Sequence, residues 1–112
     1  MIEPIGERGE AECQQNNKKA DEQIRQALRY AELANDTSQT ASICIMAGVM
    51  AFVLEKTDSC AYWFNRSAAL FEALGREDKA AFARSKLGNI YEAQGQFALA
   101  TPLFEQALKT AQ

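Results

Sequence analysis

Histidine is absent from the 112 residues of this sequence, so the chain lacks the side chain that enzymes use most often as a general base. Without it the chain cannot build a Ser-His-Asp or Cys-His catalytic group, nor bind a metal through imidazole. Its glycines form neither a phosphate-binding loop nor a dinucleotide-binding fingerprint. The 15 acidic residues leave a catalytic carboxylate pair open, but solvation of helix surfaces explains them better. We therefore expect no enzyme, with no catalytic, cofactor-binding or metal site.

Cysteine is scarce too, and the three cysteines are Cys13, Cys44 and Cys60. No two of them have the Cys-x-x-Cys spacing that structural zinc sites use. Cys44 and Cys60 stand among apolar neighbours, which predicts reduced, buried thiols in a cytoplasmic protein. Cys13 stands in a polar segment, where a reactive thiol stays open as an alternative.

An excess of positive charge and a long apolar run are also missing. The chain has 12 basic and 15 acidic residues, for a net charge of −3, whereas nucleic-acid binders usually carry a basic face. The most apolar stretch, residues 41–54, is too short to span a bilayer. The N-terminus begins with acidic residues and lacks the apolar run of a signal peptide. We expect neither a nucleic-acid nor a membrane partner.

No segment alternates as a strand does, and no Asn-Gly or Asp-Gly pair marks a hairpin. Helical periodicity, punctuated by glycines and capping residues, instead predicts five helices. We place them at about 11–34, 37–54, 58–74, 78–94 and 97–111, in one domain over 11–112 that follows a flexible arm over 1–10. Asn35 and Gly75 are the expected helix stops, and Asp36 and Asp78 the expected caps. The second helix is apolar almost all round, which predicts that other helices surround it.

Internal repetition decides the fold class. A shift of 40 residues superimposes Ala20, Cys60 and Ala100, then Ile24, Phe64 and Phe104, and it places Gly48 on Gly88. Each unit is a helix pair, and a single pair buries its apolar faces only by stacking on neighbours. The small residues let helix axes approach closely, and the phenylalanines fill the space between paired helices. The prediction is an all-α array of antiparallel helix pairs.

The residues Leu87, Gly88, Tyr91, Gly95, Ala100, Phe104 and Ala107 follow the spacing of a tetratricopeptide repeat. Residues 87–108 resemble the version with a period of about 40 residues that kinesin light chains and many bacterial regulators contain. The resemblance implies a right-handed superhelix of about five helices. The sequence departs from the pattern at two positions. Glu55 stands where the pattern has Gly95, so we expect a longer or differently shaped first inner turn, and Arg84 replaces a usual bulky residue.

The resemblance also implies a function, because members of this family usually hold a peptide or helix in a concave groove lined by the first helix of each pair. The chain would then be an adaptor or scaffold with a protein or peptide partner. The groove-lining residues implied by the register are Ile45, Val49 and Phe52 from the second helix and Phe82, Lys86, Asn89 and Glu92 from the fourth. Lys86 and Asn89 resemble part of a clamp for C-terminal carboxylates, but the second helix lacks the matching residues. The chain's own arm, through Ile2 and Ile5, or the first helix could equally cover the apolar part.

Two other functions stay open: a self-associating regulatory or oligomerisation module, and a small chaperone that shields an apolar segment of a client. The apolar stripe of the fifth helix is wider than the fourth helix can cover. Leu99, Leu103 and Ala111 are our candidates for the uncovered part, and exposed apolar patches tend to mark interfaces. The chain would then form a homo-oligomer through this C-terminal helix, or belong to a longer array.

Overall fold

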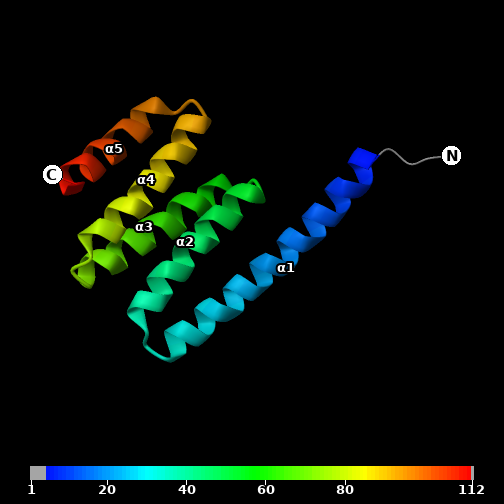
Figure 1. Ribbon diagram of the computed structural model, residues 1–112, viewed down its shortest axis with the longest axis horizontal. Helices are drawn as coiled ribbons and strands as arrows, with labels where there is room; N and C mark the ends of the chain where they lie inside the picture. Colours follow the sequence, from blue (N-terminus) through cyan, green and yellow to red (C-terminus); the bar gives the residue numbers. More distant parts are fainter. Residues whose placement is uncertain (1–4, 112) are drawn as a thin grey trace.

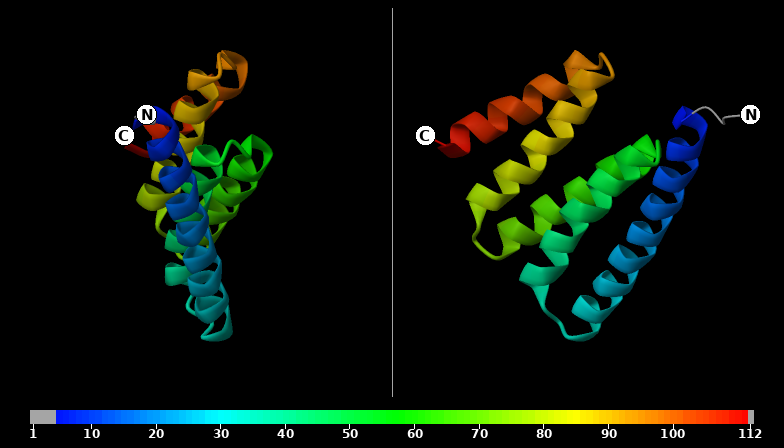
Figure 2. Two further views of the ribbon diagram at one scale, coloured as in Figure 1. Left: turned by 90° about the vertical axis from the view of Figure 1, so that its right-hand side faces the viewer. Right: turned by 45° about the vertical axis from the view of Figure 1, so that its right-hand side comes forward.

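A computed structural model describes the backbone of residues 5–111 and the side chains of residues 16–56 and 58–109. Over the described backbone the chain forms five α-helices and no strand: α1 (Ile5–Leu33), α2 (Thr37–Val53), α3 (Thr57–Ala73), α4 (Glu77–Ala93) and α5 (Phe97–Ala111). Consecutive helices are antiparallel and follow one another across the molecule in chain order, from α1 at one end to α5 at the other (Figure 1, Figure 2). The predicted all-α repeat of helix pairs is confirmed.

The helix boundaries agree closely with the prediction except at the N-terminus. Because α1 begins at Ile5, residues 5–10 are helical, whereas the sequence analysis assigned them to a flexible arm; residues 1–4 lie outside the described residues. The radius of gyration is 16.3 Å, against about 13 Å for a compact chain of this length. The array is therefore extended, as expected where each helix packs mainly on its neighbours in the chain.

The turns between helices repeat every 20 residues. Each contains one residue with positive φ: Asn35 (56°), Glu55 (61°), Gly75 (74°) and Gly95 (77°). The same backbone hydrogen bond closes the turns, and the Lys56 N–H that donates to the Ala51 carbonyl at 2.8 Å has counterparts in the other three. The expectation of a differently shaped turn at Glu55 is therefore wrong. Glu55 adopts the left-handed conformation that a side chain disfavours by about 1–2 kcal/mol.

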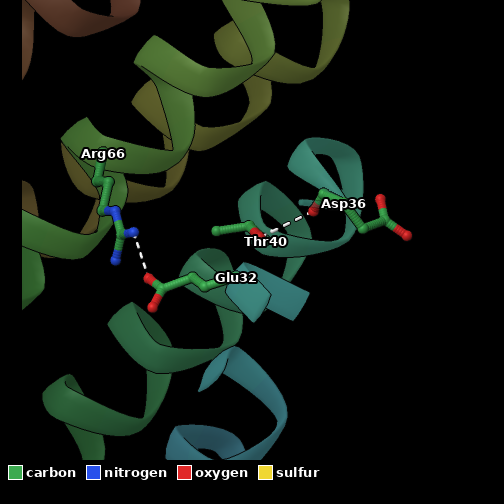
Figure 3. Close-up of polar contacts among 4 residues, drawn as sticks. All are labelled: Glu32, Asp36, Thr40 and Arg66. Atoms are coloured by element: carbon green, nitrogen blue, oxygen red, sulfur yellow. Dashed lines mark hydrogen bonds and ion pairs between the residues drawn. The ribbon is translucent and has the colours of Figure 1, made fainter. Parts of the chain in front are cut away.

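The start of α2 follows the predicted capping pattern. The Asp36 carboxylate accepts a hydrogen bond from the Gln39 backbone N–H at 3.0 Å. The Thr40 hydroxyl donates to the Asp36 carbonyl at 2.8 Å (Figure 3). The start of α4 differs, because Arg76 occupies the N-cap position without a side-chain cap. Asp78 instead lies in the first turn, where a carboxylate interacts favourably with the helix dipole.

The core is a series of apolar seams between successive helices. The side chains of Ile24, Leu28 and Ala31 on α1 pack against Ile43, Cys44 and Ala47 on α2. The next seam centres on Phe64 and Phe71 of α3, each 1% exposed. Gly48 and Gly88 lie against the rings of Phe64 and Phe104, respectively. These glycines allow the close approach of α2 to α3 and of α4 to α5.

Candidate functional site

The apolar helix α2 is covered on two sides and open on the third. One side packs on α1 through Ile43, Cys44 and Ala47, and another packs on α3 and α4 through Ala41 and Ala51. The expectation that other helices surround α2 is thus correct for two sides only. The third side carries four exposed apolar residues, here called the α2 stripe: Met46 (55% exposed), Val49 (42%), Phe52 (40%) and Val53 (47%).

A pocket of about 450 Å³ lies between α2 and α4, at the N-terminal end of the α2 stripe. It is lined by Ser42 and Ile45 from α2, Phe71 from α3, and Asp78, Lys79 and Phe82 from α4. The exposed ring of Phe82 forms one wall, and the buried ring of Phe71 contributes from the helix in between. The volume falls within the range of small-ligand pockets, about 300–1,000 Å³. The pocket therefore has room for one or two bulky apolar side chains of a partner.

The α2 and α4 faces correspond residue by residue. The two helices run in the same direction with α3 between them (Figure 1). The 40-residue register pairs Ser42 with Phe82, Met46 with Lys86, Val49 with Asn89, and Phe52 with Glu92. The structure brings the predicted residues Ile45 and Phe82 together in the pocket. Val49 and Phe52, and Lys86, Asn89 and Glu92, lie further along the same two helices, so the shared surface is apolar on α2 and polar on α4.

Two lysines of α4 lie over aromatic rings at this surface. The Lys79 Nζ is 5.6 Å from the centroid of Phe71, and the Lys86 Nζ is 5.3 Å from the centroid of Phe82. Both distances permit a cation–π attraction. Within the part of the chain that the structure describes, neither lysine forms an ion pair.

The carboxylate in the pocket has a cationic partner of its own. The Arg76 guanidinium donates to Asp78 Oδ1 at 3.3 Å and to Oδ2 at 3.4 Å. These hydrogen bonds hold the pKa of the Asp78 carboxyl below its usual range, so it stays ionised at neutral pH with its charge balanced by Arg76. The Lys79 ammonium group at the pocket and the Lys86 ammonium group beside Phe82 are thus the charges of this surface that a partner can pair.

Three pocket residues were not predicted from the sequence: Phe71, Asp78 and Lys79. The spacing of Lys79, Phe82 and Lys86 at i, i+3 and i+7 is the signal that could have placed Lys79 on the same face. The alternative that α1 covers the apolar residues is not what the structure shows, because α1 packs on a different side of α2. The alternative of cover by the arm concerns Ile2 and the side chain of Ile5, which lie outside the described residues.

The exposed apolar surface of α5 is a separate feature. Leu99 is 51% exposed, whereas Leu103 is half-buried and packs against the seam around Phe64. The side chain of Ala111 lies outside the described residues. Phe97 (62% exposed) and Leu108 (61%) are more exposed than Leu99, although neither was among the predicted candidates.

Ion pairs on other surfaces join successive helix pairs. The Arg66 side chain of α3 donates to the Glu32 carboxylate of α1 at 2.5 Å (Figure 3). Glu72 stands 40 residues after Glu32, and it accepts a hydrogen bond from Arg84 of α4. The departure at Arg84 thus has a structural explanation: the guanidinium links α4 to α3 where the repeat pattern has a bulky residue.

Two chemical features are not found in the described part of the chain. No group of three or more cysteine and acidic side chains gathers there in a way that could hold a metal ion. None of the helices there combines the length and the apolar character needed to cross a membrane.

Comparison with known proteins gives one match. Residues 41–112 match a family model described as tetratricopeptide repeat. No curated protein and no solved structure matches the chain.

Proposed function

Because this chain belongs to the tetratricopeptide repeat family, we propose that it is an adaptor or scaffold whose α2–α4 surface binds a peptide or helix of a partner protein. Repeats of this family generally mediate protein–protein interactions. The observation that carries the proposal is the α2 stripe, four exposed apolar side chains that continue from the pocket at Ile45 and Phe82. A partner segment with a few apolar anchors gains by burying them there.

The test compares two variants that place the same charge on exposed apolar positions. Val49→Glu lies on the α2 stripe, and Leu33→Glu, on α1 at 74% exposure, is the control. Neither substitution should change the melting temperature much, since both side chains are exposed. Affinity capture with mass spectrometry should recover partners with wild type and Leu33→Glu but lose them with Val49→Glu. Recovery with all three would place the binding site elsewhere.

A second candidate function is self-association through α5, and the 40-residue register favours it. Ala68 of α3 is 3% exposed and lies in a cluster with Ala41 of the preceding helix and Ala80 and Ala83 of the following one, whereas Leu108, its counterpart on α5, is 61% exposed. In the first repeat this position holds an alanine that other helices bury. In the next repeat it holds a leucine, a larger apolar side chain, and no helix of the described chain covers it. A second copy of the chain, related by a two-fold axis, would cover it in a closed assembly.

Light scattering behind size exclusion, over a wide concentration range, tests self-association. The wild type should show a mass above one chain at high concentration, and Leu108→Glu should shift it toward the monomer while the far-UV circular dichroism spectrum stays helical. We prefer Leu108 to Leu103 for this variant because Leu103 also supports the core. A wild type that remains monomeric throughout contradicts this second function.

We also propose a cytoplasmic location. The buried thiols of Cys44 and Cys60 are free, and reduced cysteines are typical of cytosolic proteins.

A further inference from the structure

We propose that Met46 is a modification site of the α2 stripe: a peroxide oxidises its thioether to the sulfoxide, and the sulfoxide weakens the binding of a partner. The proposal rests on the proposed function and adds a way in which the chemical state of the surface controls that binding. Met46 is 55% exposed, and exposed thioethers are the ones that oxidants in solution reach.

Met46 has the most accessible sulfur atom among the described side chains, those of residues 16–56 and 58–109. Met50 is half-buried and packs on the seam between α1 and α2. Cys44 and Cys60 are each 0% exposed, and burial raises the pKa of both thiols, which leaves little of the reactive thiolate. A peroxide should therefore react with Met46 before it reacts with the other three.

The position of Met46 on α2 gives its oxidation a consequence for binding. Ile45, which lines the pocket, precedes it, and Val49 lies three residues further on, about one turn along the same helix face. A partner segment that extends from the pocket to Val49 therefore covers Met46. The flexible thioether adapts to such an apolar partner.

The reaction is a two-electron oxidation of the sulfur. The Sδ lone pair attacks one oxygen of hydrogen peroxide, the O–O bond breaks, and the leaving hydroxide takes the proton of the transferred oxygen and departs as water. Methionine sulfoxide reductases reverse the change: a dithiol supplies two electrons and two protons, becomes a disulfide, and the oxygen leaves as water. The modification is thus reversible.

The sulfoxide affects the complex more than the free protein. In the free protein water solvates the sulfoxide oxygen, because the side chain is exposed, so the stability of the fold should change little. Under a partner the oxygen loses this water, and the apolar side chains of the stripe around it offer no hydrogen-bond donor. Burial of a polar group without a partner should weaken binding by about tenfold.

The first experiment measures the selectivity of oxidation and needs no partner. The full chain is treated with hydrogen peroxide, digested with a protease and mapped by mass spectrometry over time. Met46 should be converted to the sulfoxide before Met50, and the melting temperature of the oxidised chain should stay close to that of the untreated one. In urea, where the chain is unfolded, the two methionines should react at similar rates.

The second experiment measures binding with a peptide that lacks methionine and cysteine, selected by phage display on the untreated chain and required to lose binding to Val49→Glu. Treatment of the wild type with peroxide, followed by catalase, should weaken this peptide about tenfold in fluorescence anisotropy. A methionine sulfoxide reductase should restore the affinity. Compared with its own untreated sample, Met46→Leu should not respond to peroxide, whereas Met50→Leu, the matched control, should respond as the wild type does.

The outcomes separate this inference from the proposed function. If the selected peptide binds the oxidised wild type as tightly as the untreated one, if Met50 reacts first, or if Met46→Leu responds to peroxide as the wild type does, the modification site is overturned and the proposed groove is supported. If every enriched peptide binds Val49→Glu and Ile45→Asp as tightly as wild type, the proposed function is overturned, and the inference with it. A library without any enriched peptide overturns both.

Discussion

The two glycines that face phenylalanine rings offer a sharp test of how the helix pairs pack. A Cβ atom added at Gly48 would lie 2.8, 2.9 and 3.0 Å from three atoms of the Phe64 ring. The same atom added at Gly88 would lie 3.0, 3.1 and 3.3 Å from the Phe104 ring. The two positions are equivalent in the 40-residue register, so each serves as the control for the other.

The difference in stability follows from how far each ring can move. An alanine in place of a helical glycine gains about 1 kcal/mol in helix propensity, and overpacking a core costs about 1–3 kcal/mol. Phe64 is 1% exposed and enclosed by Ala51, Cys60 and Leu87, so Gly48→Ala should destabilise the protein by about 1 kcal/mol net. Phe104 is half-buried and can shift toward solvent. Gly88→Ala should therefore be neutral or more stable by up to about 1 kcal/mol.

Urea unfolding followed by far-UV circular dichroism measures both variants, with a difference of about 1–2 kcal/mol expected between them. Phe64→Leu gives space beside position 48, so the cost of Gly48→Ala should shrink in that background and the double-mutant cycle should be non-additive. A Gly48→Ala protein at least as stable as Gly88→Ala would refute the reasoning.

Three further predictions concern the turns, the thiols and an ion pair. Glu55→Gly should raise the free energy of unfolding by up to about 1 kcal/mol in urea titrations, because it relieves the left-handed strain but makes the unfolded chain more flexible; a loss of stability would contradict this. Burial raises the pKa of the Cys44 and Cys60 thiols above the ordinary 9.0. The unfolded state therefore loses these protons first, and the free energy of unfolding should fall as the pH rises above about 9, less steeply in Cys44→Ala/Cys60→Ala. Arg84→Leu should change the melting temperature little, since its partly exposed pair with Glu72 contributes only about 0–1 kcal/mol; a large drop would show that the pair is essential to stacking.

The fold was predictable because the 40-residue repeat and the residues that stop or cap helices indicate the same helix boundaries. The 40-residue register aligned Phe64 with Phe104 and Gly48 with Gly88, and the structure places each ring against its glycine. The Glu55 turn was not predictable from residue preference, because tertiary packing of the flanking helices imposes the same left-handed residue every 20 positions. The predicted start of α1 was wrong because residue preference again misleads. Pro4, Gly6 and Gly9 suggest an irregular segment, yet the backbone is helical from Ile5. A proline is tolerated next to a helix start, so it marks the beginning of α1 as well as it would mark an arm.

The candidate binding surface was predictable as a set of helix faces but not as a pocket. Periodicity places Val49 and Phe52 on one face of α2 and Phe82 and Lys86 on one face of α4. It does not show which side of a mostly apolar helix stays open, because that depends on where α1 docks, and α1 docks on the side of Ile43. The sequence likewise shows neither that Arg76 neutralises Asp78 nor that the Lys79 ammonium lies over the Phe71 ring. These contacts cross a turn or a helix boundary.

The proposed groove and the exposed α5 surface belong to different members of each helix pair, so their proposed roles are separate. The groove is built by α2 and α4, the first helices of their pairs, and the exposed Leu108 lies on α5, the second helix of its pair. A polar pocket that includes Glu77 and Lys109 lies between α4 and α5 and carries no part of the apolar groove. Because each helix packs mainly on its neighbours in the chain, a second copy stacked on α5 would leave the α2 stripe and the pocket lysines open to solvent. The proposed self-association and the proposed peptide binding are thus compatible in this array. An assembly through α5 would present two grooves, which would raise the apparent affinity for a partner that contains two binding segments.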